Sequence, residues 1–359
     1  MVAPIIGYLS DRHGRRRVLL TAMIGNICSV ALWISATDFR TFLASRVVGG
    51  LSEANVQLAN SIVADITDEA SRSASMALVG ACFSIAFTFG PMLGAALSSV
   101  EVVKANPFVA AALVSFVLIL LETIYLWAYL PETHPRFSKL KHVDEAKGFS
   151  GEKPIMKTNS SAPNTSPKTT NNPAIISTIY FFFLLPFSGL EFSLPFLVAT
   201  LHTGPIIISP AALNGRLLSL IGLTSSLLQG TIVRRLPPLL MVRAGIMACA
   251  LSFFSLAHIS SLVGLYAVGG FLAVTTATVV TGLNGLCSLE AGDTDRGVVM
   301  GRLRGWGQAG RAAGPIVFCT LFWWAGRQVA YTMGGLAMCV VAFSTFILLE
   351  SPSLHVKAE

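Results

Sequence analysis

Ten long apolar segments constrain this chain of 359 residues more than any other feature. Most are close to the roughly 20 residues that a helix needs to cross the hydrocarbon core of a bilayer. The segments are 18–36, 41–64, 76–99, 107–130, 174–199, 211–233, 238–258, 262–288, 302–325 and 328–349. Pro and Gly inside several of them suit a membrane bundle, where neighbouring helices satisfy the freed backbone groups. The sequence therefore predicts an all-α, polytopic membrane protein with ten full transmembrane helices and an N-terminal stub over 1–9.

The charged residues are few and unevenly distributed. They make up 12% of this chain, whereas soluble domains usually carry about 25%. If the basic turn at 11–17 faces the cytoplasm, most Lys and Arg residues fall in cytoplasmic segments, and only Arg40, Lys104 and Arg327 lie outside. The positive-inside rule explains this asymmetry, so the net charge of +7 indicates topology and not nucleic-acid binding. We expect both termini to lie in the cytoplasm. We expect the protein itself to lie in the plasma membrane or in an internal (vacuolar) membrane.

A polar stretch at 131–173 interrupts the hydrophobic pattern with Lys, Ser, Thr, Asn and Pro. Such a composition cannot bury enough apolar area to offset chain entropy, which predicts a disordered cytoplasmic linker. The linker separates an incomplete N-terminal helical bundle at 1–130 from a C-terminal six-helix bundle at 174–350. Residues 351–359 are then a cytoplasmic tail.

The two bundles resemble copies of each other. Arg72 precedes a Gly-Pro pair at position 90 by 18 residues, and Arg296 precedes another at position 314 by the same distance. Parallel halves of this kind are common in transporters. Aligning the halves leaves the first helix and most of the second without a counterpart at the amino end. Two explanations stay open: a truncated product or gene model, or a protein that works with an incomplete first bundle.

The run from Gly7 to Arg17 carries one carboxylate and four guanidinium groups between two apolar segments. Its pattern is Gly, three residues, Asp-Arg, one residue and Gly-Arg-Arg, and it resembles the cytoplasmic signature loop of major facilitator superfamily transporters. The resemblance implies two six-helix bundles, so the ten full segments correspond to helices three to twelve and the stub to the end of helix two. It also implies that Asp11 braces one bundle against the other in one state. The expected gating residues are Gly7, Asp11, Arg12, Gly14, Arg15 and Arg16.

Polar groups inside the second full segment recur at helical spacing. Arg46, Gly50, Glu53, Gln57 and Asn60 follow one another at intervals of four, three, four and three, which places them on one face of a helix. A central charge in a bilayer is costly, so we expect Glu53 to face a water-filled cavity and exchange a proton under the influence of Arg46. The alternative is a polar seam that only locks helices together. The run from Arg46 to Gly50 also resembles the fourth-helix motif of the superfamily.

Three further residues are expected on the pathway of protons or substrate. Glu191 lies in a segment interrupted by two prolines and a glycine, and broken helices often border substrate sites. Gln308 and Arg311 lie one turn apart, and Arg311 is a candidate partner for an anionic substrate group or for a Glu. The alternatives are a solvated carboxylate near the outer mouth and a snorkelling arginine.

Two Gly-Pro elements are expected to bend helices or to bring them into close contact. The first, Gly90-Pro91 followed by Gly94, resembles the fifth-helix motif of antiporters in the superfamily. The second is Gly314-Pro315. Three further runs resemble the tetracycline-transporter-like branch of the drug:proton antiporters: 188–192, Gln229-Gly230 followed by Arg234-Arg235, and 301–304 leading to 311–315. This similarity covers essentially the whole chain, with the linker as its main gap.

The sequence thus predicts a secondary active transporter that exchanges protons for a small organic solute or drug by alternating access, in the direction of efflux. The alternatives are a uniporter or symporter on the same fold and a truncated, non-transporting membrane protein. The sequence has no nucleophile with a base at plausible spacing, no metal-ligand cluster and no Walker loop, so we expect no enzyme activity, cofactor or metal site. The expected partners are protons, a small organic solute and the lipid bilayer, and the protein is expected to be monomeric.

Overall fold

The computed structural model describes residues 2–98, 109–137, 170–201, 210–292 and 295–352, and the regular elements in these ranges are all helical. The first half contains α1 (Ala3–His13), α2 (Arg15–Ile34), α3 (Phe39–Ser52), α4 (Asn55–Ile66), α5 (Glu69–Ser98) and α6 (Val109–Tyr129). The second half contains α8 (Pro173–Leu201), α9 (Pro210–Thr231), the 3-10 turn η1 (Val233–Arg235), α10 (Pro238–His258), α11 (Leu262–Glu290), α12 (Arg296–Ala325) and α13 (Arg327–Leu348).

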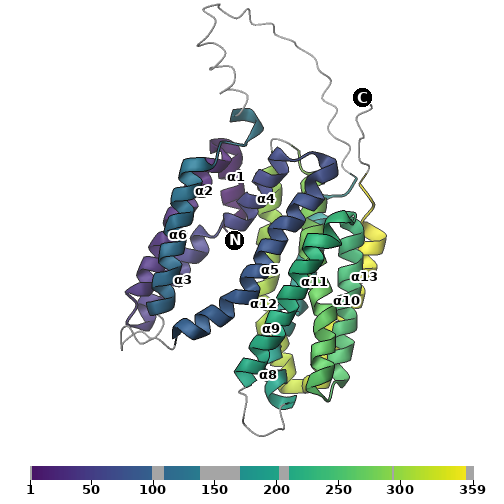
Figure 1. Ribbon diagram of the computed structural model, residues 1–359. Coiled ribbons are helices and arrows are strands. Elements are labelled where there is room, and N and C mark those ends of the chain that lie inside the picture. The colour runs from purple at the N-terminus through teal and green to yellow at the C-terminus, as the bar shows by residue number, and fades with distance from the viewer. Residues whose placement is uncertain (1, 99–108, 138–169, 202–209, 293–294, 353–359) are drawn as a thin grey trace, which may run out of the picture.

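The helices form two bundles that lie side by side, with α1–α6 in one and α8–α13 in the other (Figure 1). In the second bundle α8 packs along α12, and α10 packs against both α11 and α13. Buried side chains from these helices form one large core, which includes Phe183, Leu190, Phe253 and Tyr331. The first bundle has a smaller core around Leu58 of α4.

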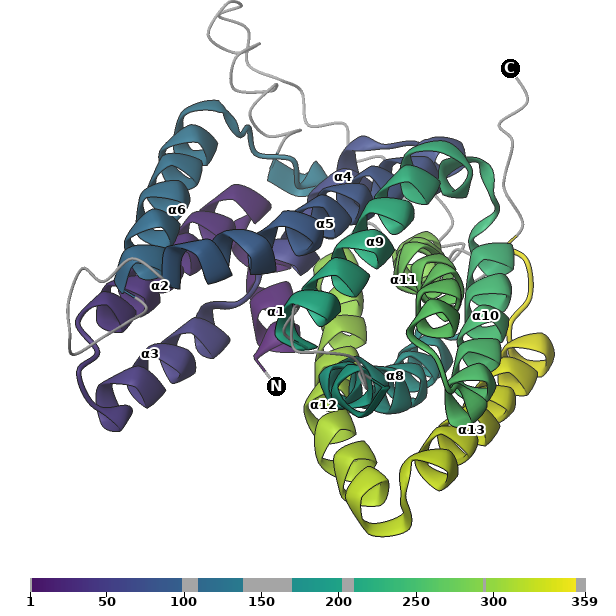
Figure 2. The ribbon, with the colours of Figure 1, turned by 60° about the horizontal axis from the view of Figure 1, so that its bottom comes forward.

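The bundles are joined where α1 packs on α12 and where α5 packs on α9 (Figure 2). At the first contact the two backbones touch. A Cβ atom added to Gly7 would lie 2.1 Å from the carbonyl oxygen of Gly297, and one added to Gly301 would lie 2.6 Å from that of Ala3. Glycines on both helices therefore permit the close approach.

The contact between α5 and α9 is partly polar. Ser84 Oγ donates to Gln229 Oε1 at 3.0 Å and lies 3.2 Å from Ser225 Oγ. Gln229 Nε2 donates in turn to the carbonyl oxygen of Ala277 on α11 at 3.1 Å. These groups are buried, and their hydrogen bonds offset the cost of removing them from water.

Within the described residues, eight helices are long and apolar enough to cross a membrane: α2, α5, α6, α8, α9 with η1, α10, α11 and α13. Two of the ten predicted transmembrane segments, 41–64 and 302–325, are not among them. The first divides into α3 and α4, which are each shorter than a bilayer crossing, and the second lies in α12, which is rich in Gly and Arg. The count of ten full crossings therefore stays a prediction.

The stripe predicted through 41–64 does not lie on one continuous helix. α3 ends at Ser52, Glu53 has an extended backbone with φ −71° and ψ 97°, and α4 begins at Asn55. The five residues expected on one face therefore belong to two helices, with Glu53 at the break between them. The spacing continues through the break, so periodicity alone gave no sign of it.

Two other local predictions are wrong. The run 7–17 was expected to be a turn, but α1 continues to His13 and only Gly14, at φ 95°, redirects the chain. Side chains rarely tolerate a positive φ, so this position favours glycine. The broken helix expected around Glu191 is also wrong, because α8 continues unbroken through its two internal prolines.

The predicted linker is described only at its two ends, and both ends are anchored. At the first end, Glu132 accepts backbone hydrogen bonds from the start of α2. At the second, Asn171 donates to Glu290 Oε1 through its backbone N–H at 2.9 Å and through its side chain at 2.8 Å. Residues 138–169 and 353–359 lie outside the described part of the chain, so the disorder of the linker and the cytoplasmic location of the tail stay predictions.

The Gly7→Ala substitution is expected to destabilise the contact between α1 and α12, because the added methyl group meets the Gly297 carbonyl oxygen. Overpacking of this kind typically costs about 1–3 kcal/mol. Thermal unfolding of the purified protein in detergent should therefore begin at a lower temperature. Gly230→Ala is the matched control, because an added Cβ there meets nothing within 4 Å. Equal transition temperatures for the two variants would contradict the close approach.

Candidate functional site

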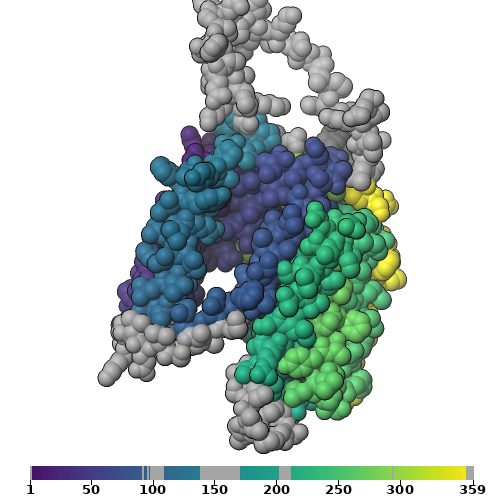
Figure 3. Space-filling model, viewed as in Figure 1, coloured from purple at the N-terminus to yellow at the C-terminus, as the bar shows by residue number. Residues whose placement is uncertain are grey.

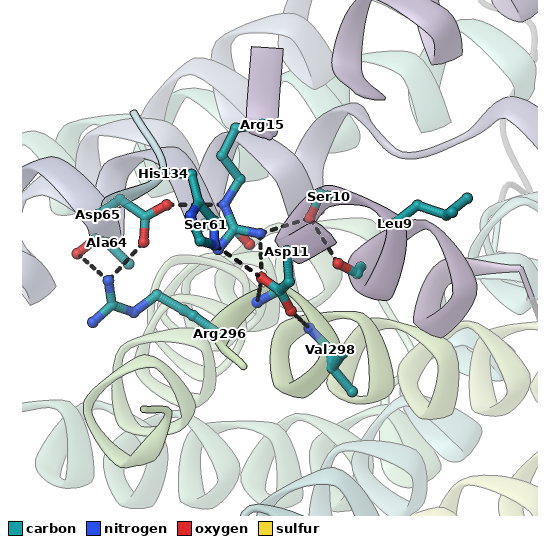
Figure 4. Close-up of polar contacts among 12 residues, drawn as sticks. Leu9, Ser10, Asp11, Arg15, Ser61, Ala64, Asp65, His134, Arg296 and Val298 are labelled. Atoms are coloured by element: carbon teal, nitrogen blue, oxygen red, sulfur yellow. Dashed lines mark hydrogen bonds and ion pairs between the residues drawn. The ribbon is translucent and has the colours of Figure 1, made fainter. Parts of the chain in front are cut away.

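A cluster of buried charges lies where α1, α2, α4 and α12 meet (Figure 4). Asp11 accepts hydrogen bonds from the backbone N–H groups of Gly297 and Val298 at 2.9 and 2.8 Å, and from Arg15 Nη1 at 2.6 Å. The two N–H groups belong to the first turn of α12, where unpaired donors and the helix dipole attract a carboxylate. Asp11 thereby ties the first bundle to the second.

Asp65, at the end of α4, holds two arginines in the same cluster. Arg15 Nε donates to Asp65 Oδ2 at 2.9 Å, and Arg296 Nη1 donates to Asp65 Oδ1 at 2.6 Å. The side chains of Asp65 and Arg15 are 0% and 1% exposed. Buried charges need partners, and here two arginines balance Asp11 and Asp65 across the two bundles. We call these four residues the seam cluster.

Sequence reasoning missed Asp65 and used Arg296 only as a marker of the repeat. The available signal was an acidic residue at the end of an apolar segment, where a lone buried carboxylate needs a cation. Its two cations lie in α2 and in α12, far away in sequence. The pairing could therefore not be deduced from spacing.

The predicted gating arginines take different positions. Arg15 lies in the seam cluster, and Arg16 Nη2 donates to the carbonyl oxygen of Trp127 on α6 at 2.5 Å. Arg12 is exposed. Glu132 accepts the backbone N–H groups of Arg15 at 2.8 Å and of Arg16 at 3.2 Å, which satisfies free donors at the start of α2.

His134 adds a titratable group beside the seam cluster. Its Nε2 lies 4.0 Å from Asp11 Oδ1, and its Nδ1 accepts the backbone N–H of Arg136 at 3.2 Å. Burial lowers the pKa of His134 from its ordinary value of 6.5, and the Arg15 guanidinium lowers it further, against the opposing effect of the three nearby carboxylates. The ring is therefore neutral at pH 7.

A cavity of about 480 Å³ lies between the two bundles. Its walls are mainly apolar and include Phe83 and Phe87 of α5 and Phe183 and Phe187 of α8. Figure 3 shows the surface hollowed between α5 and α6, and both helices contribute to the lining. The charged residues among the lining are Glu122, Glu191, Arg304 and Arg311.

Two ion pairs hold the arginines of α12 that line the cavity. Arg311 Nη2 donates to Glu191 Oε2 at 2.9 Å, within the second bundle. Arg304 Nη2 donates to Glu53 Oε1 at 3.3 Å, from the second bundle to the first. Gln308 lies between the two arginines along α12, and its amide oxygen, when turned toward Arg304, accepts from Nη2 at 2.9 Å. The structure thus brings Glu191 and Arg311 together, as two separate sequence features had singled them out.

The other residues of the predicted polar stripe lie apart from these pairs. Asn60 lines the cavity, whereas Gln57 Nε2 donates to the carbonyl oxygen of Ala3 at 2.9 Å. The Arg46 guanidinium lies over the ring of Trp33, 4.8 Å from its centroid, and the observed partner of Glu53 is Arg304. The expected influence of Arg46 on Glu53 therefore has no support in the structure. Gly50 lies on α3, where an added Cβ would meet nothing within 4 Å.

The Gly-Pro elements lie in helices that continue through them. Gly314 packs on α8, where an added Cβ would lie 2.1 Å from the carbonyl oxygen of Leu185, and Pro315 follows within an unbroken α12. Gly90 and Gly94 face open space on α5. Pro91 also lies in α5, and its side chain lies outside the described atoms.

The family model of the Major Facilitator Superfamily matches residues 1–315. This chain belongs to the major facilitator superfamily. The major facilitator superfamily domain-containing protein 10 of Mus musculus is 33% identical to it, over 99% of this chain and 77% of that protein. The class E tetracycline resistance protein of Escherichia coli is 27% identical, over 89% of this chain and 74% of that protein. The family resemblance read from the sequence is thereby confirmed.

Solved structures of the superfamily share the fold. The crystal structure of the human organic anion transporter MFSD10 (TETRAN) superimposes with a TM-score of 0.75 at 30% identity, covering 96% of this chain and 80% of that one. The proton:xylose symporter XylE superimposes with a TM-score of 0.71 over 96% of this chain and 82% of its own, at 14% identity, which supports the fold alone. The predicted two-bundle fold of a multi-pass membrane transporter is confirmed.

Acidification is expected to weaken the seam cluster through His134. A histidine whose folded pKa lies below 6.5 binds fewer protons in the folded state than in the unfolded state, so stability is lost as the pH falls through 6.5. The thermal midpoint of the wild-type protein should fall more than that of His134→Gln between about pH 7.5 and pH 5.5. Equal falls in the two proteins would exclude this role of the ring.

Proposed function

We propose that the protein is a proton-coupled secondary transporter that moves a small, amphipathic organic solute by alternating access. The observation that carries the proposal is the cavity between the two bundles, whose mainly apolar wall contains Arg304 and Arg311, each paired with a glutamate. Intramembrane charges are rare and costly, and in transporters they mark substrate and proton pathways. Family membership supports transport in general, and the ion pairs add the means of coupling to protons.

The chemistry of the cavity suits a solute with an apolar body and an anionic group. Phenylalanine side chains from both bundles offer apolar contact, and Arg304 and Arg311 offer guanidinium groups. Among the relatives, one is described as an organic anion transporter and others as tetracycline resistance proteins. The proposed solute has both an apolar body and an anionic group.

Alternating access requires a closure that forms and breaks between the bundles. The seam cluster supplies such a closure, because Asp11 and Asp65 of the first bundle bind α12 of the second. We assign the gating role to Asp11, Arg15, Asp65 and Arg296. Glu132 and Arg16 act by holding the start of α2 in place, and Gly7 acts by permitting the contact between α1 and α12.

The motif around Gly90 and Pro91 favours antiport, and symport or uniport on the same fold are the alternatives. Cytoplasmic termini, a monomeric state, a disordered linker and a location in the plasma membrane or an internal membrane stay proposals from the sequence. The ion pair of Glu191 and Arg311 favours symport for one class of solute, the organic anions.

Uptake into proteoliposomes tests the proposed function. Glu191→Gln and Arg311→Gln are expected to lower pH-driven uptake of a solute by about tenfold or more, because a hydrogen bond to a charged group contributes about 1.5–3 kcal/mol and each 1.4 kcal/mol is a factor of ten. Arg216→Gln is the matched control, since Arg216 is an exposed arginine of α9 outside the cavity lining. If vesicles with folded protein take up no more of any tested solute than empty vesicles do, the result would favour the non-transporting alternative.

A further inference from the structure

The ion pair in the cavity determines how a proton and an anionic solute affect each other. Arg311 Nη2 is 2.9 Å from Glu191 Oε2, and the two side chains are 36% and 25% exposed. Both residues line the cavity, so a solute that enters it reaches the guanidinium and the carboxylate together. The pair is neutral as a whole while the cavity holds no solute.

Glu191 is the carboxylate that contacts Arg311, and Glu122 of α6 lines the same cavity from the first bundle. The titratable groups that face it are Cys249 of α10, Tyr180 on the same helix as Glu191, and Glu53 from the first bundle. Glu53 is itself paired with Arg304. On the neighbouring α13, Tyr331 hydrogen-bonds to Ser193, which lies two residues after Glu191. Glu191 is therefore the proton acceptor that responds most directly to what binds Arg311.

An anionic group that binds Arg311 must replace Glu191 as its partner. Two negative groups at one guanidinium repel each other in an apolar cavity, where water screens charges weakly. Protonation of Glu191 removes this repulsion and frees the guanidinium at the same time. By linkage, binding of the anion and binding of the proton therefore favour each other.

We propose that Arg311 binds the anionic group of an organic solute while Glu191 carries one proton, so that anion and proton cross the membrane in the same direction. The inference rests on the proposed transport function and specifies its solute and its coupling. Charge is balanced in both forms of the carrier. The empty site holds Arg311 with a positive charge and Glu191 with a negative one, and the loaded site holds the same arginine, a neutral Glu191 and one negative charge on the solute.

Both forms of the site are thus neutral, which suits a cavity with apolar walls. A monovalent anion moved with one proton transfers no net charge across the membrane. Exchange of the same anion for a proton would transfer two charges in each cycle, and uniport would transfer one. The membrane potential therefore distinguishes the three modes of transport.

The test uses p-aminohippurate, an aromatic monocarboxylate, and the full-length protein in liposomes. A medium one pH unit more acidic than the lumen is expected to drive about tenfold accumulation of the probe, because one proton accompanies each anion and one pH unit is a factor of ten. A potassium diffusion potential set with valinomycin should leave the accumulation unchanged. Accumulation driven by the opposite pH gradient, or by the potential, would overturn the inference.

Substitutions then assign the effect to the pair. Glu191→Gln is expected to retain exchange of external for internal p-aminohippurate but to lose the tenfold accumulation. Arg311→Gln should lose both, and Arg311→Lys should recover part of the exchange because it restores the positive charge. Arg216→Gln should match the wild type. Accumulation that persists in Glu191→Gln would assign the proton to another group and contradict the proposal.

The uptake of p-aminohippurate and that of tetracycline together distinguish a failure of this inference from a failure of the proposed function. If p-aminohippurate is not taken up in any gradient while tetracycline uptake responds to the pH gradient, the protein is a proton-coupled transporter and the anion assignment is wrong. If neither compound is taken up by correctly folded protein, the proposed function fails as well. If Glu191→Gln does not fold, the gradient experiment on the wild-type protein still decides the direction of coupling.

Discussion

The carboxylate of Asp11 at the first turn of α12 is the contact on which the arrangement of the two bundles depends. It accepts two backbone N–H groups of the second bundle and one guanidinium of the first, so a single side chain satisfies donors on both sides. The approach of α1 to α12 is close enough for this because Gly7 and Gly297 meet without side chains. Removal of the carboxylate would leave unpaired donors at a helix terminus and an arginine without one of its partners.

The same principle of balanced charge recurs in the cavity. Each arginine of α12 that lines it has a glutamate, and one of those glutamates belongs to the opposite bundle. At the seam the paired charges hold the bundles together. In the cavity they allow an anionic solute to replace Glu191 as the partner of Arg311. Each set includes at least one arginine of α12, Arg296 at the seam and Arg304 and Arg311 at the cavity, so this helix connects the closure with the solute site.

The sequence predicts the helices well because apolar length and Pro-Gly placement are local properties. It also singles out Asp11, Glu191 and Arg311, since charges beside or inside apolar segments are conspicuous. It does not predict the break at Glu53, where the spacing of polar residues continues across the end of α3. It also cannot predict that Asp65 pairs with Arg296, because nothing local in either segment specifies a partner 231 residues away. Glu132 and His134 were assigned to a linker on composition, yet Glu132 contacts the start of α2 and His134 lies beside Asp11 of α1.

The most direct test of this account measures the distance between the bundles at the seam. Spin labels are placed at positions 13 and 302, which are both exposed, in a background without reactive cysteines. Pulsed electron paramagnetic resonance then measures the distance between α1 and α12. The account predicts a short separation in the protein with Asp11 and a shift of the population to longer distances in Asp11→Asn, with membrane insertion intact. Identical distance distributions in the two proteins would contradict the claim that this carboxylate holds the bundles together.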